Sequence, residues 1–360
     1  MDGRRMRLVF ALRSPRRARR SLPLGRQPGF ETAHAAADKM QGAIKRRLLK
    51  LLPVAMGAAL FLAALWVLYH ELRKYPPESI LRSLEAIPAQ AILLAFLLSA
   101  ANYLILIQFD ALAFRSIGEH LPYRRIMLAA FVGYALSNNA GFNTISGSSV
   151  RYRFYAAWGV PGGEIFRVIV FYSLTFWVGL FWLGGTLFLF QPMDIPAALR
   201  IPFDTVRPLG AILLLLGVAY LVLCALARKS LHLWRLEIAL PSLRMAVFQI
   251  VLAALDWMLV SAVLYALLQP ADRIPYLSFL GIFMLAQIAG LVSQVPGGIG
   301  VFETVIVLLL REILPSPQIL GALLAFRAIY YLLPLVVALV LMGVHEIVEK
   351  RGKGDAEMRG

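Results

Sequence analysis

Cysteine is almost absent from the chain, which has a single one, Cys224, among 360 residues. This cysteine lies within an apolar stretch, so the sequence excludes a disulfide framework and a cysteine-based metal cluster. Histidine is scarce as well, and the spacing of the histidines is not that of a metal site. The five histidines are His34, His70, His120, His232 and His345. We therefore expect neither a metal ion nor a cofactor.

Familiar enzyme motifs are also missing. The sequence contains no HExxH, no GxSxG and no GxxxxGK[ST]. Its GGIG segment at 297–300 lacks the strand and helix that surround a dinucleotide-binding loop. We expect no catalytic residues and interpret the protein as a non-enzyme.

Charged residues make up only 16% of the chain, whereas 60% of the residues are hydrophobic and the mean hydropathy is +0.73. A soluble domain has about 45–50% apolar residues, so the composition indicates an integral membrane protein. The net charge of +16 is concentrated at the start, where residues 1–50 hold 14 Lys/Arg and 3 Asp/Glu. We interpret residues 1–47 as a disordered cytoplasmic tail that touches anionic lipid, and we expect no nucleic-acid binding.

Apolar runs of span length predict an all-α polytopic membrane protein. The six full transmembrane helices are expected at 51–69, 89–107, 165–190, 209–227, 245–268 and 319–342. Two further apolar stretches, 126–147 and 277–310, are interrupted by the glycine-rich segments LSNNAGFNTISG and SQVPGGIG. We interpret both as broken, re-entrant segments. The second stretch also fits two short spans, 277–293 and 299–314.

The charges of the loops set the expected topology. If 126–147 is re-entrant, the cytoplasmic segments hold 28 Lys/Arg and the outer loops hold 7. This asymmetry obeys the positive-inside rule and places both termini in the cytoplasm, with residues 346–360 as a short tail. We expect one membrane domain over 48–345.

The order of the expected elements repeats. Two spans, a broken segment and one span in residues 51–190 are followed by the same order in 209–342, starting from the opposite side of the membrane. Inverted repeats with paired broken segments are a recurring architecture of secondary transporters, in which the substrate binds between the breaks. We therefore predict an inverted repeat with these two halves.

The breaks supply candidate binding residues, because broken backbone at membrane depth must line protein or water. A phosphate-sized anion would suit the first break, where polar backbone and serines are followed by two arginines. The candidates in the first break are Ser137, Asn138, Asn139, Gly141, Ser146, Gly147, Arg151 and Arg153. Those in the second are Pro296, Gly297, Gly298, Gly300 and Glu303. Alternatively, the two arginines are ordinary loop residues of the cytoplasmic side.

Three further charges, Asp110, Asp256 and Arg327, lie within or beside apolar spans. A charge in hydrocarbon is costly enough that it should have a partner or face a cavity. Arg327 is expected either in a structural ion pair with Asp256 or Glu303, or in a polar pathway for a lipid headgroup or a proton. Asp110 is either a functional charge or a boundary residue at the end of its span.

Four segments carry a family resemblance: YLILIQFDALAFRSIG, GYALSNNAGFNTISGSSVRYRFYAAWGV, AQIAGLVSQVPGGIGVFETVIVLLL and FRAIYYLLP. Together they resemble the transmembrane, flippase-like family of lysylphosphatidylglycerol synthases, over residues 50–342. The bifunctional members of this family attach an aminoacyl group to phosphatidylglycerol in a cytoplasmic domain and flip the product in the membrane region. The chain ends at Gly360, so the resemblance implies a member without the transferase domain.

The resemblance implies a translocase or lipid-binding transporter for an anionic or aminoacylated phospholipid, such as lysylphosphatidylglycerol, or for another lipid-linked headgroup. The alternative is a non-catalytic membrane partner of a separately encoded lipid synthase. A third reading is the phosphatidylglycerol lysyltransferase itself, against which the missing soluble domain argues.

Overall fold

The computed structural model describes residues 76–140, 143–191, 205–226, 231–233, 236–238, 240–270, 273–293 and 298–357. The first expected span, 51–69, and the basic tail, 1–47, lie outside these residues. Within them the fold is all-α, apart from a two-stranded antiparallel ribbon made by β1 (Leu231–Leu233) and β2 (Leu236–Ile238). A short helix, α2 (Pro77–Glu85), precedes the first described span.

Five helices in the described part are long and apolar enough to cross a membrane. Two of them are continuous helices with a π-helical segment inside, η1 or η4. The five are α3 (Ala89–Ile117), α6–η1–α7 (Gly162–Gly179, Leu180–Gly184, Gly185–Phe190), α8 (Arg207–Leu226), α9 (Leu243–Leu268) and α12–η4–α13 (Ser316–Phe326, Arg327–Leu332, Leu333–Glu357). They confirm five of the six expected spans, and α13 continues as a helix into the segment expected to be a tail.

Each broken segment is a helical hairpin. The first pairs α4 (Tyr123–Ala140) with α5 (Asn143–Ala157), and the second pairs α10 (Tyr276–Ser293) with α11 (Val301–Leu310). At 1.5 Å per residue, α11 is about 15 Å long, roughly half of a hydrocarbon core. A helix this short favours re-entry over two short spans for the second segment.

Helix α5 corrects the expected boundary of the first break. The loop charges predict that the first broken segment ends at residue 147 and that a cytoplasmic segment follows, but residues 148–157 form most of α5. The reason is an apolar face that the polar residues conceal: Val150, Phe154 and Tyr155 are buried in the main core.

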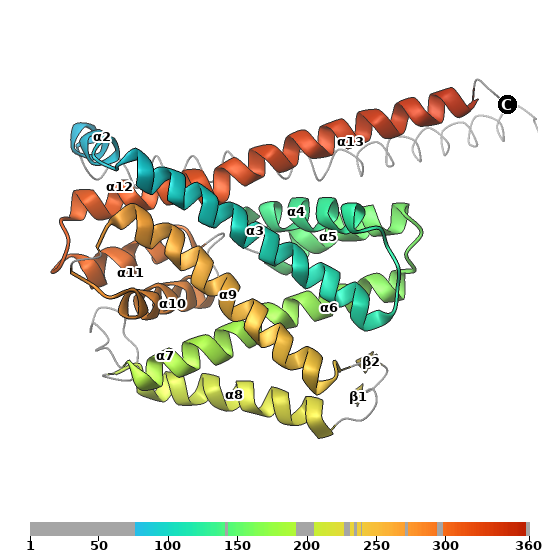
Figure 1. The fold of residues 1–360 in the computed structure, drawn as a ribbon, viewed down its shortest axis with the longest axis horizontal. Coiled ribbons are helices and arrows are strands. Elements are labelled where there is room, and N and C mark those ends of the chain that lie inside the picture. Colours follow the sequence, from blue (N-terminus) through green and yellow to red (C-terminus); the bar gives the residue numbers. More distant parts are fainter. Residues whose placement is uncertain are drawn as a thin grey trace, which may run out of the picture. The chain divides into compact units, whose positions relative to one another are not determined.

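The two hairpins lie at opposite ends of the spanning helices (Figure 1). The open end of the α4–α5 hairpin lies where α3 ends and α6 begins. The open end of the α10–α11 hairpin lies where α9 ends and α12 begins. Helices α3 and α9 pack against each other between them. Each hairpin also packs against the π-containing helix of the other half, α4 against η4 and α13, and α10 against η1 and α7. This is the arrangement that an inverted repeat requires.

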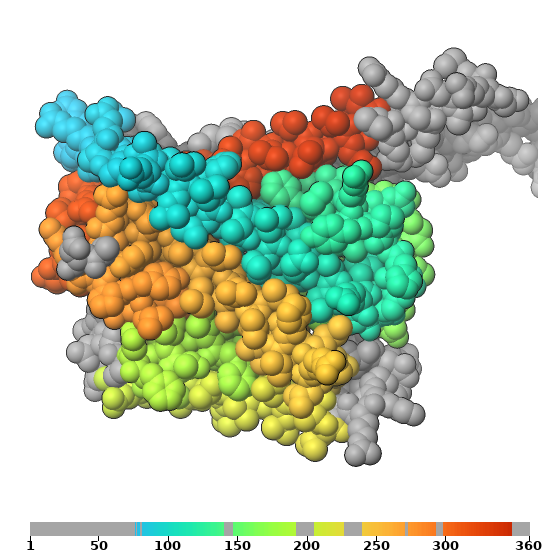
Figure 2. All heavy atoms as spheres, in the orientation of Figure 1, coloured from blue at the N-terminus to red at the C-terminus, as the bar shows by residue number. Residues whose placement is uncertain are grey.

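One face of the bundle is formed by α3, α9 and α8, which lie side by side (Figure 2). Large apolar side chains point outward along all three helices, among them Leu97, Leu104, Leu215 and Val251. Helices that are apolar on both their buried and exposed faces are suited to hydrocarbon. The outer surface therefore agrees with the membrane environment that the composition predicts.

Close packing of α7 on α8 depends on a glycine. A Cβ atom at Gly185 would lie 2.7 Å from the backbone nitrogen of Leu214. Backbone cannot move away as the end of a side chain can, so the Gly185→Ala variant should push the two helices apart. We expect a loss of about 1–3 kcal/mol in the free energy of unfolding, measured by denaturant titration in detergent micelles.

Gly163→Ala is the matched control for this prediction. Gly163 also lies in a helix, α6, and a Cβ atom there meets nothing within 4 Å. This variant should be neutral or stabilised by up to about 1 kcal/mol. Equal stabilities of the two variants would contradict the close approach of α7 and α8.

Candidate functional site

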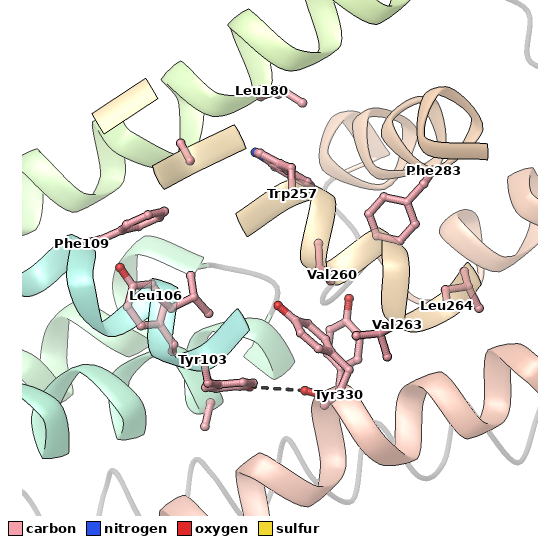
Figure 3. Close-up of a cluster of buried hydrophobic side chains, with 14 of the residues drawn as sticks. Tyr103, Leu106, Phe109, Leu180, Trp257, Val260, Val263, Leu264, Phe283 and Tyr330 are labelled. Atoms are coloured by element: carbon pink, nitrogen blue, oxygen red, sulfur yellow. Dashed lines mark hydrogen bonds between the residues drawn. The ribbon is translucent and has the colours of Figure 1, made fainter. Parts of the chain in front are cut away.

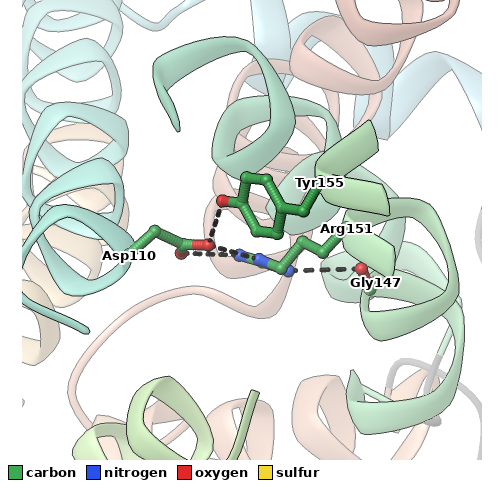
Figure 4. Close-up of polar contacts among 4 residues, drawn as sticks. All are labelled: Asp110, Gly147, Arg151 and Tyr155. Carbon is green, nitrogen blue, oxygen red and sulfur yellow. Dashed lines mark hydrogen bonds and ion pairs between the residues drawn. The ribbon is translucent and has the colours of Figure 1, made fainter. Parts of the chain in front are cut away.

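Asp110 and Arg151 form an ion pair inside the bundle (Figure 4). Nε and Nη2 of Arg151 donate to the two carboxylate oxygens of Asp110 over 2.7 and 3.0 Å. The hydroxyl of Tyr155 donates a third hydrogen bond to Asp110 over 2.8 Å. Both charged side chains are 0% exposed. The pair joins α3 to the returning helix of the first hairpin, α5.

The surroundings of Arg151 are built to hold a buried guanidinium group. Its central carbon lies 4.1 Å from the ring centroids of both Tyr134 and Tyr172, whose planes are inclined by 73° to each other, so two aromatic rings contact the cation from different sides. A Cβ atom at Gly133 would lie 2.5 Å from Nη1, so only glycine leaves room for the guanidinium there. Residues of α4, α5 and α6 thus enclose the charge that α3 neutralises.

This geometry changes the interpretation of three predicted residues. Arg151 is not an ordinary loop residue, and Asp110 is not a boundary residue, because both are fully buried. Since two of the donor nitrogens of Arg151 bind Asp110, a phosphate would have to displace this carboxylate. Arg153 differs from these two residues, because its side chain is partly exposed and its Nη2 lies 3.6 Å from Oε1 of Glu346, on α13.

A second ion pair joins the second hairpin to η4. Nε and Nη2 of Arg327 lie 2.7 and 2.5 Å from Oε1 of Glu303, the third residue of α11. The other oxygen of Glu303 accepts a hydrogen bond of 2.7 Å from the backbone N–H of Gly300. The ring centroid of Tyr331 lies 4.5 Å from the guanidinium carbon. Of the two partners expected for Arg327, the structure therefore selects Glu303.

The second pair is less enclosed than the first. The side chains of Arg327 and Glu303 are 9% and 13% exposed. Glu303 follows directly on a turn in which Gly298 and Gly300 have φ values of +61° and +85°, a region that side chains disfavour. The glycines of the second break thus place the carboxylate of Glu303 in the first turn of the short helix α11, where it is slightly exposed.

The remaining break residues divide between structural contacts and residues outside the description. Asn138 donates to the hydroxyl of Tyr103 over 3.4 Å, and Asn139 donates to the carbonyl of Tyr331 over 3.1 Å. Ser137 and Gly147 are buried where the two helices of the first hairpin meet. The placement of Gly141, Pro296 and Gly297, and the side chain of Ser146, lie outside the described residues.

Asp256 takes no part in either pair. Its Oδ1 accepts a hydrogen bond of 2.7 Å from the amide of Asn102, and its backbone carbonyl accepts another of 2.9 Å. The hydroxyl of Tyr330 donates to the amide oxygen of Asn102 over 2.7 Å. Asn102 and Tyr330 were not among the residues predicted from the sequence. Asn102 could have been recognised there as a single amide in the middle of an apolar span.

The Asp110→Asn variant tests the importance of the first pair. It leaves the charge of Arg151 buried without a counter-charge, which costs about 3–5 kcal/mol in the free energy of unfolding. The double variant Asp110→Asn/Arg151→Gln removes both charges and should recover part of this loss. Denaturant titration in micelles measures the free energy of unfolding of wild type and of both variants.

The exposed pair Glu164–Arg167, with a distance of 3.0 Å, supplies the control. Glu164→Gln should change stability by only about 0–1 kcal/mol, because solvent screens the pair. If Asp110→Asn were as mild as this control, or if the double variant were no more stable than Asp110→Asn, the buried pair would not stabilise the fold as proposed.

Comparisons with known proteins agree with the membrane fold. The chain is 39% identical to the uncharacterized protein slr0712 of Synechocystis, over 85% of this chain and 95% of the relative. It is 32% identical to the inner membrane protein YbhN of Escherichia coli, over 83% and 94%. It is 25% identical to the phosphatidylglycerol lysyltransferase of Staphylococcus haemolyticus, over 83% of this chain but only 34% of that enzyme.

A family model also matches most of the chain. Residues 54–338, which include both hairpins and both ion pairs, match the family described as the lysylphosphatidylglycerol synthase TM region. The chain therefore belongs to this family of multi-pass membrane proteins.

Proposed function

We propose that the protein is a lipid translocase of the bacterial inner membrane, whose cargo is a phospholipid with an anionic or aminoacylated headgroup. The inner-membrane location is supported by the likeness to YbhN, and the cargo class by the likeness to the phosphatidylglycerol lysyltransferases. The match covers about a third of those enzymes, so their transfer chemistry is not part of the proposal.

The observation that carries the proposal is the less enclosed pair, Arg327 with Glu303, at the turn of the second hairpin. A lipid headgroup crosses hydrocarbon only if its charges are met by groups of the opposite sign. Lysylphosphatidylglycerol has a phosphate and an aminoacyl ammonium group. Arg327 is suited to bind the phosphate and Glu303 the ammonium, each exchanging its partner in the protein for one in the lipid.

The first pair has a different role in this proposal. Asp110 and Arg151 are fully enclosed and hold the first hairpin against α3. A fixed hairpin on one side and a less enclosed one on the other give the bundle a rigid part and a part that admits the headgroup. This division resembles transporters in which one element moves against another around a central site.

Glu303→Gln tests the proposal in proteoliposomes that contain fluorescently labelled lysylphosphatidylglycerol and phosphatidylglycerol. Dithionite quenching measures how fast the label exchanges between leaflets. We expect the variant to move lysylphosphatidylglycerol at least about tenfold more slowly than wild type, because one lost charge-assisted contact is worth about 1.5–3 kcal/mol. Movement of phosphatidylglycerol, which has no ammonium group, should fall less.

Glu312→Gln is the control, because Glu312 is also a glutamate of the second half but is 82% exposed. Its rates should equal those of wild type, and the melting temperature of each variant should be measured beside its rate. Equal rates for Glu303→Gln and Glu312→Gln, with both variants folded, would overturn the headgroup site. A lack of lipid movement by wild type would overturn the translocase itself.

One observation favours a second function, that of a membrane subunit for a separately encoded lipid enzyme. In the lysyltransferases, the matched third is joined to a further two thirds of the chain. A protein that has the same membrane region is suited to dock such an enzyme. Stable co-purification of an envelope-lipid enzyme from membranes, with no lipid movement by the purified protein, would support this function over translocation.

A further inference from the structure

Asp256 is the buried carboxylate that neither ion pair uses. It lies in the middle of α9, where this helix packs against α3, and it is 6% exposed. Asp110, which is buried, and Glu303, which is slightly exposed, each bind an arginine. Among the described residues, the hydrogen-bond partner of the Asp256 side chain is the neutral amide of Asn102.

The groups around Asp256 supply no positive charge in the described part of the chain. The titratable side chains that interact with it electrostatically are tyrosines, namely Tyr103, Tyr134 and Tyr330. Of the other elements packed on α9, η1 and α12 have no titratable side chain. The tyrosines that reach α9 from α8 and α10 bind residues other than Asp256, Tyr220 at Gln249 and Tyr276 at Met258 and Ser261. On α6, the ring of Tyr172 contacts the guanidinium group of Arg151, a residue of α5 that is paired with Asp110.

Burying an ionised carboxylate without a counter-charge costs far more than burying the neutral acid. The described arrangement satisfies Oδ1 through Asn102 and assigns no hydrogen bond to Oδ2. A proton on Oδ2 makes the group neutral and leaves the bond from Asn102 in place. The enclosed state therefore favours the protonated acid, and a state in which water reaches Asp256 favours the carboxylate.

Hydrogen bonds connect this site to the first hairpin. Asn102 binds Asp256 and Tyr330, and the carbonyl of Tyr330 accepts a bond of 3.3 Å from the hydroxyl of Tyr103 (Figure 3). The same hydroxyl accepts a bond from Asn138, near the end of α4. One polar network thus joins residues of α9, α3, η4 and α4. A change of charge at Asp256 therefore affects the hydrogen bonds that reach the first hairpin.

We propose that Asp256 is a proton-binding site and that one proton taken up and released there is coupled to each lipid moved. In one step the carboxylate takes a proton from water on one side of the membrane and becomes the neutral acid. In the return step the O–H bond breaks and the proton leaves to water on the other side. The coupling rests on the proposed lipid movement, whereas proton binding does not.

Infrared difference spectroscopy tests proton binding without transport. Wild-type protein in lipid is titrated with acid, and the carbonyl stretch of a protonated carboxylic acid is recorded. Other acids of the chain absorb in this region once they are protonated, so the assignment rests on the difference between variants. We expect wild type and Glu312→Gln to show a component of the band that Asp256→Asn lacks. If wild type shows no such band at any pH at which it stays folded, or if Asp256→Asn keeps the full band, Asp256 does not bind the proton.

Lipid asymmetry tests the coupling. Proteoliposomes with labelled lysylphosphatidylglycerol are held at zero membrane potential under a gradient of one pH unit, and the label in each leaflet is measured after the distribution is steady. With one proton per lipid, wild type should hold the label at a ratio of about ten between leaflets. Asp256→Asn should lose this asymmetry, and Ser261→Ala, on the same helix, should keep it.

The outcomes separate the two proposals. If wild type moves the label but leaves it evenly distributed under the pH gradient, the coupling is wrong and the translocase stands. If an equal sodium gradient produces the asymmetry instead, the ion is sodium and the proton site is wrong. If wild type moves no label under any condition, the translocase and the coupling both fail, and the infrared band alone decides whether Asp256 binds a proton.

Discussion

A membrane interior gives a buried charge no water to bind, and this constraint governs the whole bundle. The pair of Asp110 and Arg151 shows this constraint most clearly, because both side chains are fully buried and the hydroxyl of Tyr155 also binds the carboxylate. Two tyrosine rings contact the cation, and a glycine makes room for it. The pair attaches a hairpin that does not span the membrane to a helix that does, and the packing of α4, α5 and α6 follows from it.

Three acids of the bundle differ in the partners that neutralise them. Asp110 is enclosed with its arginine, Glu303 binds an arginine beside a glycine turn at slight exposure, and Asp256 has only an amide. Because a charge is stable in hydrocarbon only with a counter-charge, these three sites differ in how readily they exchange a partner. In our account the first holds the structure, the second meets the lipid headgroup, and the third takes up a proton.

Much of the architecture was predictable, because the length of an apolar run sets whether it spans the membrane. The glycines of the two breaks predicted interruptions, and the structure shows a helical hairpin at each. Pairing was harder to predict. Asp110 and Arg151 are 41 residues apart, and the polar residues of α5 concealed its apolar face. Arg327 had two candidate partners in the sequence, and only the packing of α11 beside η4 decides for Glu303.

We expect the two hairpins to enter the membrane from opposite faces, and cysteine labelling distinguishes this arrangement from entry on one face. In a Cys224→Ala background, His120→Cys lies at the open end of the first hairpin and Glu312→Cys at that of the second, both exposed. Intact spheroplasts are treated with a membrane-impermeant maleimide. We expect Glu312→Cys to react and His120→Cys to react only after lysis. Reaction of both from the same face would contradict the account.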